Sequence, residues 1–355
     1  MGQGIDALDP ATLTDLLHKS SLTAGATVSS VERRQVGTGQ VASCWELALR
    51  LDGHADPITI VAKVSSDDET SRATAAMLGL YEREVRFYEH LASTVVIRTP
   101  HCYASSFDKT TGDFVLLLES MSPVGEADQL AGLPLARAEL ALRELAGLHG
   151  PHWGSPTLKG ADVVRDDPAA EGDGATLLIP SLFDAFLERH GASLSDEARG
   201  VVEWLKPRLA TYFAGRDGPK TLIHGDYRTD NLLFDGRGGE VPLAVVDWQM
   251  AAHGSGAHDV AYLLTTSLDP QVRRDHEREL LAGYLARLVD LGVADYDAAA
   301  LHADYAWHAF QGIVMLVCAA VIVERTDRGD DMFLTMIERA ATAVEDLDSR
   351  RVMEP

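Results

Sequence analysis

The sequence predicts an α+β protein in which a small N-terminal antiparallel sheet lobe precedes a larger, mainly helical C-terminal lobe. Strand-like segments dominate the first 120 residues, and helical periodicity dominates after residue 135. Between these regions, the run from Glu119 to Pro123 breaks the apolar pattern. Since 355 residues suffice for two lobes, we expect an N-terminal lobe at 1–118, a hinge at 119–124 and a C-terminal lobe at 125–355.

The N-terminal lobe is expected to begin with a short helix. Asp9 supplies a helix cap and Pro10 a first-turn proline for a helix at Ala11–His18. Apolar and β-branched runs then predict four strands and the end of a fifth, and apolar residues at helical spacing predict one long helix. The strands are expected at 27–36, 41–51, 58–64 and 114–118, with a further strand ending at 105–109, and the helix at 70–92.

Two features of this lobe suggest contacts with a ligand. Gly37 and Gly39 lie in the connection between the first two strands, where glycine lets backbone N–H groups approach phosphates closely. Alternatively, the two glycines have no contact with a ligand and serve simply to form the hairpin turn. Lys63 interrupts an otherwise buried strand, and a lysine in that position requires a partner or a ligand unless the strand lies at an edge in solvent.

The C-terminal lobe is expected to be built mainly of helices. Leu135–His149 has apolar residues at helical intervals and ends at a Gly-Pro stop signal. The composition of Asp166–Gly174 is typical of a loop. Further helices are expected at 178–190, 195–214, 259–266, 280–291, 300–325 and 332–347.

The most informative stretch is Thr221–Gln249. An apolar run precedes His224-Gly225-Asp226, and Asn231 follows five residues after Asp226. A second apolar run directly precedes Asp247. Polar residues after short strands lie at strand ends or on tight loops. Phosphoryl transfer to a hydroxyl requires one carboxylate for the hydroxyl proton and hard oxygen ligands for Mg²⁺. Asp226 fits the base, and Asn231 and Asp247 fit the metal ligands.

This spacing matches the catalytic loop of protein kinases, with two departures: Gly225 replaces the usual arginine, and Asp247-Trp248-Gln249 replaces Asp-Phe-Gly. His224-Gly225-Asp226 with Asn231 and Asp247-Trp248 resembles the aminoglycoside phosphotransferase and choline kinase-like superfamily. The sequence motif HGDYRTDN at residues 224–231 is similar to that of the phosphotransferase-family and ecdysteroid-kinase-like branch of this superfamily. The resemblance implies a protein-kinase-like bilobal fold and an ATP- and Mg²⁺-dependent kinase that phosphorylates a hydroxyl group of a small molecule.

The resemblance also implies roles for residues of the N-terminal lobe. Glu84 resembles the glutamate that pairs with the strand lysine, so we expect a Lys63–Glu84 ion pair that directs Lys63 to the nucleotide phosphates, with Glu82 as the alternative partner. Gly37 and Gly39 would then cover the phosphates. The hinge would bind adenine through backbone groups of Glu119 and Met121.

Two further residues of the catalytic region are expected to have roles. Arg228 could steady the γ-phosphate or lie on the loop surface, and Asp259 could support the catalytic loop or cap the following helix. Only eleven residues separate Asp247 from Asp259, which leaves little room for the segment that docks a peptide in protein kinases. A small-molecule acceptor is therefore favoured over a protein kinase, and a nucleotide-binding pseudokinase is the alternative from another functional class.

Composition limits the partners and the compartment. The net charge of −23 (31 basic and 54 acidic residues) opposes binding to nucleic acid and anionic membranes. The three cysteines lack metal spacing, the N-terminus lacks a signal peptide, and the longest apolar run, Ile313–Val323, reads as a buried core helix. We expect a cytoplasmic monomer or homodimer. His149 and His152 could suggest a metal site, but their position at the end of a helix favours a structural role.

Overall fold

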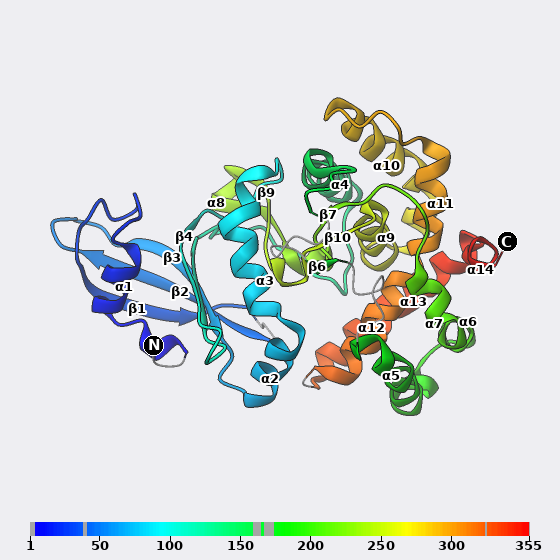
Figure 1. The fold of residues 1–355 in the computed structure, drawn as a ribbon, viewed down its shortest axis with the longest axis horizontal. Helices are drawn as coiled ribbons and strands as arrows, with labels where there is room; N and C mark the ends of the chain where they lie inside the picture. The colour runs from blue at the N-terminus through cyan, green and yellow to red at the C-terminus, as the bar shows by residue number, and fades with distance from the viewer. Residues whose placement is uncertain (1–3, 38–40, 159–164, 167–173, 324, 355) are drawn as a thin grey trace.

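The structure is a computed structural model that describes residues 4–37, 41–158, 165–166, 174–323 and 325–354. A five-stranded antiparallel sheet with three helices forms the N-terminal part, and helices dominate the rest of the chain (Figure 1). The α+β fold with a small sheet lobe and a larger helical lobe is therefore confirmed.

The sheet has the strand order β1-β2-β3-β5-β4, and every neighbouring pair is antiparallel. All five strands lie within two residues of a predicted strand. Their bounds are β1 Val28–Gln35, β2 Ala42–Leu51, β3 Ile58–Ser65, β4 Cys102–Phe107 and β5 Phe114–Glu119.

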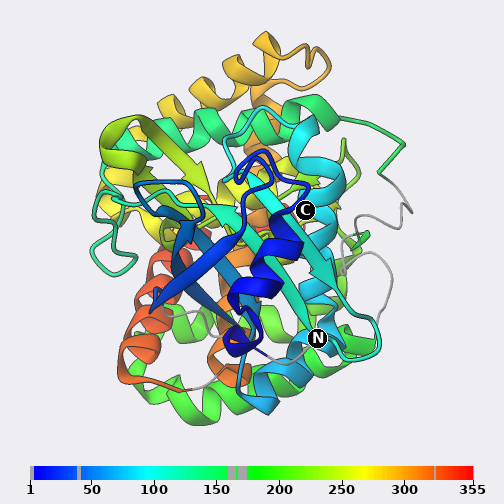
Figure 2. The same cartoon turned by 90° about the vertical axis from the view of Figure 1, so that its left-hand side faces the viewer.

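Alternation along the strands gives the sheet two buried faces. On the outer face, Ile60 and Ala62 of β3 are fully buried with Leu13 and Leu17 of helix α1 (Pro10–Leu17). Figure 2 looks onto this face and shows α1 lying across the strands. The cap of α1 is as predicted, because the Asp9 carboxylate accepts the N–H of Thr12 at 2.8 Å.

The inner face of the sheet packs on the helix that was predicted at 70–92. That helix is divided: α2 (Glu69–Leu78) ends at Gly79, which has φ +65, and α3 (Leu80–Arg86) follows. A left-handed glycine ends a helix because its N–H turns back onto the last carbonyls, here those of Ala75 and Ala76. A π-helical turn, Phe87–Leu91, and a 3-10 turn, Ala92–Thr94, continue the segment.

Ten helices of four or more residues with regular geometry build the described part of the C-terminal lobe. They are α4 Leu135–His149, α5 Gly174–His190, α6 Asp196–Leu205, α7 Leu209–Ala214, α9 Gly256–Ser267, α10 Pro270–Asp290, α11 Ala298–His308, α12 Phe310–Ile322, α13 Asp327–Asp346 and α14 Ser349–Met353. Of the predicted loop at 166–174, residues 167–173 lie outside the described residues.

Three predicted helices of this lobe differ from the structure by an interruption or by ten residues at one end. The helix predicted at 195–214 is interrupted by a 3-10 turn that contains Pro207, because proline cannot donate the next helical hydrogen bond. The helix predicted at 300–325 is divided into α11 and α12 at Ala309. Helix α10 begins ten residues before the predicted start, where Asp269 caps it and where charged residues leave no apolar periodicity.

Short strands carry the loops of interest. β7 (Thr221–Ile223) pairs with β10 (Ala252–Gly254), which also pairs with β6 (Arg165–Asp166). β8 (Leu232–Asp235) and β9 (Val241–Val245) form a hairpin. Gly236–Gly239, labelled α8 in Figure 1, is the turn of that hairpin and contains left-handed residues.

By length and composition alone, the continuous helical stretch Ala298–Ile322 is long and apolar enough to cross a membrane. It includes both α11 and α12. In the fold, 67% of its most apolar window is buried, and Phe310, Ile313 and Val317 have no exposed surface. It therefore packs as a core helix of this lobe, as the sequence predicts for Ile313–Val323.

Candidate active site

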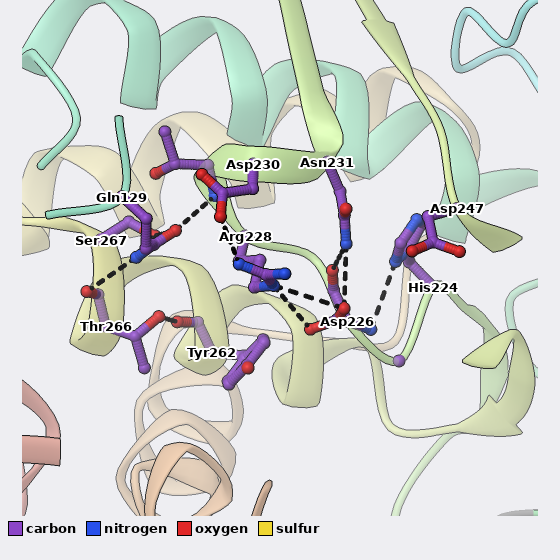
Figure 3. A network of polar contacts seen from close by, with 12 residues as sticks. Gln129, His224, Asp226, Arg228, Asp230, Asn231, Asp247, Tyr262, Thr266 and Ser267 are labelled. Carbon is purple, nitrogen blue, oxygen red and sulfur yellow. Dashed lines mark hydrogen bonds and ion pairs between the residues drawn. The ribbon is translucent and has the colours of Figure 1, made fainter. Parts of the chain in front are cut away.

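The loop after β7 brings Asp226 and Asn231 together. The side-chain Nδ2 of Asn231 donates to the backbone oxygen of Asp226 at 2.8 Å and to its Oδ2 at 3.0 Å (Figure 3). Gly225 has φ +84, and a Cβ there would lie 2.3 Å from the carbonyl oxygen of Met250. Glycine is therefore required at the position where the motif departs from protein kinases, because the backbone of the next loop passes too close for a side chain.

Arg228 lies beside Asp226, with Nε 3.3 Å from Oδ1, and its NH1 donates to Asp230 at 2.7 Å. Burial opposes the charge of Arg228, but the carboxylates of Asp226 and Asp230 raise its pKa above the usual value. The guanidinium is therefore a permanent positive charge next to the candidate base. Its side chain is 21% exposed, so Arg228 is partly buried rather than on the loop surface.

Asp247 follows β9 in a left-handed conformation, with φ +69. Its Oδ1 lies 2.7 Å from Nζ of Lys63, which comes from β3. The same Nζ lies 2.9 Å from Oε1 and 2.7 Å from Oε2 of Glu84, which comes from α3. The predicted Lys63–Glu84 ion pair is thus confirmed, and the alternative partner Glu82 instead pairs with Arg86.

The two carboxylates of this cluster stabilise the charge of Lys63. Burial opposes the charge on Lys63, but Asp247 and Glu84 raise its pKa well above the usual value. Burial would raise the pKa of Asp247, but Lys63 outweighs it and holds that pKa below the usual value. Burial raises the pKa of Glu84, against the influence of Lys63. Lys63 therefore remains protonated and Asp247 ionised at neutral pH.

Aromatic packing fixes the segment that carries Asp247 onto the N-terminal lobe. Trp248 is fully buried and stacks on Phe87, with ring centroids 3.9 Å apart. Arg83 of α3 donates to the carbonyl oxygen of Gln249 at 2.9 Å. Glu84 is consequently held close to Asp247 by packing as well as by Lys63.

Asp259 lies inside α9 rather than at its start, so the prediction that it could cap the helix is wrong; Ser255 occupies the cap position. The other prediction, that Asp259 supports the catalytic loop, is confirmed. Its carboxylate accepts the backbone N–H of His224 at 2.6 Å and of Gly225 at 2.9 Å. His149 and His258 each contact it at 3.2 Å.

The histidines around Asp259 explain its charge. Burial would raise the pKa of Asp259, but the bonds from His149 and His258 lower it well below the usual value. Burial lowers the pKa of His149, and its second ring nitrogen lies 2.7 Å from the hydroxyl of Tyr284. His149 is therefore a structural residue, as expected. His152 lies 2.7 Å from the Thr94 hydroxyl, and no cluster of three or more His, Cys, Asp or Glu residues able to hold a metal occurs among the described residues.

The glycines of the first hairpin are only partly described. Gly37 is exposed, has φ +73 and would accommodate a Cβ without contact, so its geometry requires glycine only for the backbone angle. Gly39 lies outside the described residues.

Each of the two predicted hinge residues uses one backbone group within the protein. The N–H of Glu119 donates to His101 at 2.8 Å, away from β3, and the carbonyl of Met121 accepts the N–H of Arg237 at 2.8 Å. Adjacent residues of an extended strand direct their backbone groups to opposite edges, so Ser120 points to the β3 side.

Ser120 lies between the two predicted hinge residues. Continuing the β3–β5 register places it opposite Thr59, beyond the last pair, Ile60 and Glu119. Among the described residues, no backbone group pairs with the N–H or C=O of Ser120. Ser120 and Ser122 line a polar cavity of about 470 Å³ with Thr59 and Arg237. That backbone groups of Glu119 and Met121 bind adenine stays a prediction.

The donor set around Asp247 fits a magnesium ion. The Nδ2 of Asn231 faces two acceptors, the backbone oxygen and Oδ2 of Asp226, and these fix the orientation of the amide. Its Oδ1 has no donor among the described residues. Asp247 adds an ionised carboxylate that is 27% exposed. Carboxylate and amide oxygens are the ligands that Mg²⁺ prefers.

A model of the phosphotransferase enzyme family matches residues 56–302 of the chain. This range contains Lys63, Glu84, Asp226, Asn231 and Asp247.

The fold is similar to three solved structures. A choline kinase from Cryptosporidium parvum has a TM-score of 0.58 and 10% identity, with 91% of each chain covered. An ethanolamine kinase from Plasmodium vivax has a TM-score of 0.53 and 13% identity, with 90% of this chain and 82% of that chain covered. The GDP complex of aminoglycoside 2'-phosphotransferase-IIIa has a TM-score of 0.52 and 16% identity, with 94% and 98% covered. The bilobal kinase-like fold is thereby confirmed.

Two curated relatives match a short stretch. Acyl-CoA dehydrogenase family member 10 of Mus musculus is 42% identical over 62 residues, and acyl-CoA dehydrogenase family member 11 of Gallus gallus is 37% identical over 62 residues. Each match covers 18% of this chain, and the chain spans only 5% and 7% of the length of these relatives.

Proposed function

The chain belongs to the phosphotransferase enzyme family, and from this premise we propose that it is a Mg²⁺- and ATP-dependent kinase that phosphorylates a hydroxyl group of a small molecule. One observation carries the proposal. Side chains from β3, α3, the catalytic loop and the end of β9 supply a cation, a candidate base and two hard oxygen ligands in one site. Phosphoryl transfer requires these groups and little else from a protein, since it depends on positioning and charge.

Asp226 would orient the acceptor hydroxyl and receive its proton. Its 15% exposed carboxylate is held by Asn231 and Arg228, which fix its direction while leaving it accessible. Arg228 would place a permanent positive charge beside the transferred phosphoryl group. Both effects favour a transition state in which the negative charge is spread over the phosphoryl oxygens.

Lys63 would contact the nucleotide phosphates from the sheet side, and Glu84 keeps it pointing there in the absence of nucleotide. Asn231 and Asp247 would hold Mg²⁺, which when bound neutralises phosphate charge. Gly37, together with Gly39, would cover the phosphates from the hairpin.

For the base of the nucleotide, the backbone groups of Ser120 join the predicted pair Glu119 and Met121 as candidate contacts. Ser120 has free backbone groups at the cavity, whereas Glu119 donates its N–H to His101 and Met121 accepts the N–H of Arg237. The side chain of Glu119 binds Arg98 at 2.7 Å and Arg237 at 3.2 Å, so it holds the hinge against neighbouring segments.

A small acceptor is favoured over a peptide. The segment after Asp247 becomes strand β10 within five residues, and β10 is paired on both edges, by β7 and β6. An extended peptide recognised by strand addition needs a free edge, which β10 does not offer. The solved relatives are named for choline, ethanolamine and aminoglycosides, which suggests amino alcohols and aminoglycosides as the first acceptors to try.

The test is ADP release from Mg-ATP with a panel of hydroxylated compounds, in parallel with Asp226→Asn. The panel spans aminoglycosides, amino alcohols, macrolides, sugars and sterols, and GTP is compared with ATP. We expect one acceptor class to stimulate turnover and Asp226→Asn to reduce kcat by at least ~10³-fold, with Mg-ATP affinity nearly intact.

Three outcomes would contradict parts of this proposal. Turnover in Asp226→Asn equal to wild type would exclude Asp226 as the base. Nucleotide binding without turnover on any acceptor would favour a pseudokinase. Phosphorylation of proteins rather than compounds would favour a protein kinase.

A further inference from the structure

The catalytic loop is held at two points by buried polar side chains. At its start, Asp259 accepts the N–H groups of His224 and Gly225. At its far end, the N–H of Thr229 donates to Oε1 of Gln129 at 2.9 Å. Gln129 lies between the hinge and α4, 100 residues from Thr229 in the sequence, and Figure 3 shows its amide directed at the loop.

Gln129 is fully buried, and both ends of its amide are used. Nε2 donates to the carbonyl oxygen of Thr266 at 3.1 Å and to Oγ of Ser267 at 3.1 Å. The orientation is fixed by its neighbours, because the Thr229 N–H can only donate and the Thr266 carbonyl can only accept. Gln129 therefore connects the catalytic loop to the C-terminal end of α9.

Arg339 of α13 holds Gln129 in place. Its guanidinium donates to the backbone oxygens of Gln129 at 2.9 Å and of Leu130 at 2.7 Å. It also reaches the carbonyl oxygen of Thr266 at 3.3 Å. Arg339 thus links the segment Gln129–Leu130 to the C-terminal end of α9, which Gln129 also contacts.

The bond from Thr229 has consequences for the active site because of where Thr229 lies. Thr229 begins the 3-10 turn that ends at Asn231. The Asn231 amide is in turn bonded to Asp226 at both the backbone and the side chain. A shift of Thr229 would therefore move Asn231 relative to Asp226, the candidate base.

We propose that Gln129, supported by Arg339, is a positioning residue for phosphoryl transfer, which fixes Asp226 and Asn231 relative to each other through the N–H of Thr229. This inference rests on the proposed function. A buried segment needs only an apolar side chain to pack, but the loop N–H needs an oxygen acceptor, and misplacement by ~1 Å can cost a catalyst ~100-fold.

The experiment compares Gln129→Met and Gln129→Glu in the full chain. Methionine keeps the size of the side chain but removes the acceptor, whereas glutamate keeps an oxygen for Thr229 and loses the donor to Thr266. The control is Tyr212→Phe, which removes the buried hydrogen bond from Tyr212 of α7 to Gln311 of α12 (2.6 Å).

Four quantities are measured: kcat and KM for Mg-ATP from ADP release, the melting temperature, and hydrogen exchange of the Thr229 amide. In Gln129→Met we expect kcat to fall about tenfold or more with KM for Mg-ATP nearly unchanged, and the Thr229 amide to exchange faster. Gln129→Glu should recover most of kcat although it melts at a lower temperature. Tyr212→Phe should lower the melting temperature without changing kcat.

Two results would overturn the inference. One is a kcat of Gln129→Met equal to that of Tyr212→Phe. The other is exchange of the Thr229 amide that is the same in Gln129→Met and wild type. A wild-type protein without Mg-ATP turnover would contradict the proposed function instead, and the exchange of Thr229 would still decide whether Gln129 holds the loop.

Discussion

Two aspartates only twelve residues apart, Asp247 and Asp259, have opposite environments. Asp259 is fully buried and accepts hydrogen bonds from two backbone N–H groups and two histidines. Asp247 is 27% exposed, it accepts a hydrogen bond from the Gln249 side chain at 3.3 Å, and its cationic partner Lys63 is shared with Glu84. One carboxylate is saturated by the protein, and the other retains capacity for a ligand.

This difference distinguishes a structural carboxylate, Asp259, from one that can bind a ligand, Asp247. A buried carboxylate with all its acceptor sites used cannot bind a ligand without losing protein contacts, so it serves the fold. A partly exposed carboxylate that faces a shared lysine can exchange that partner for a metal ion at little cost. The start of the loop is therefore fixed by a carboxylate whose contacts are all within the protein, whereas the Lys63 cluster is held by charges that a nucleotide would redistribute.

The comparison is tested most strongly by Asp259→Asn. This change removes the charge that four donors address, and we expect it to lower the free energy of unfolding by about 3 kcal/mol or more. Urea unfolding measures this loss. Because the pKa of Asp259 is held well below the usual value, its contribution is full above about pH 4 and disappears as the pH falls further, so the variant should lose stability less steeply in acid. Unchanged stability at pH 7 would break the comparison.

Asp247→Ala is expected to show the reverse behaviour. Lys63 keeps Glu84 as its partner, so the free energy of unfolding should change by less than about 1.5 kcal/mol. With Mg²⁺ present, the affinity for ATP should fall by a factor of about 10 or more, and without Mg²⁺ it should not change. Calorimetry with and without Mg²⁺ measures this, with Asp247→Asn as an intermediate variant. A larger stability loss than in Asp259→Asn would show that Asp247 is the structural carboxylate.

His308 lies beside His258, which contacts Asp259, and it provides a second test of the buried environment around Asp259. Burial, followed by the nearby His258 and Arg216, lowers the pKa of His308 to about 3, and the His258 ring lies 5.9 Å away. A histidine held neutral stabilises the fold fully above its unfolded pKa of about 6.5, and this stabilisation is lost as the pH falls towards about 3. His308→Gln should therefore reduce the loss of stability between pH 7 and pH 5 by about 2 kcal/mol. The exposed His54→Gln is the control; equal slopes in both variants would contradict the prediction.

The smallest effect is expected at the hinge. Arg237 is 49% exposed and contacts Glu119 at 3.2 Å and Glu240 at 3.3 Å. Arg237→Ala should cost no more than about 0.5 kcal/mol, because exposed ion pairs are screened and Glu119 retains Arg98. Thermal melts at low and high salt measure the difference. A cost that exceeds that of Asp247→Ala would mean that the hinge, and not the metal-facing cluster, depends on its charges for stability.

Much of the site was predictable because its signals are local. Asp226, Asn231 and Asp247 follow short apolar runs at fixed spacing, and each lies at the end of a strand or on the adjoining loop. The cap at Asp9 and the alternation of β3 are local for the same reason, since neighbouring residues and strand periodicity decide them.

Other features depend on contacts between distant segments. Glu84 and Glu82 lie two residues apart, and only the direction of α3 decides which of them reaches Lys63. Gln129 stands in a polar loop without periodicity, and its contact with Thr229 spans 100 residues. A buried polar side chain must find a partner, but the sequence does not say which one.

The sequence alone determined the chemical inventory of this protein: a candidate catalytic loop, two candidate metal ligands and a strand lysine, within an α+β chain whose polar stretch at 119–123 follows the last sheet strand. Only the tertiary structure decided which backbone groups of the hinge are free, that Asp259 supports the loop from within a helix, and that Gln129 holds its far end. The reason is physical, because spacing along the chain fixes which groups are present, whereas packing of distant elements fixes which of those groups are already satisfied.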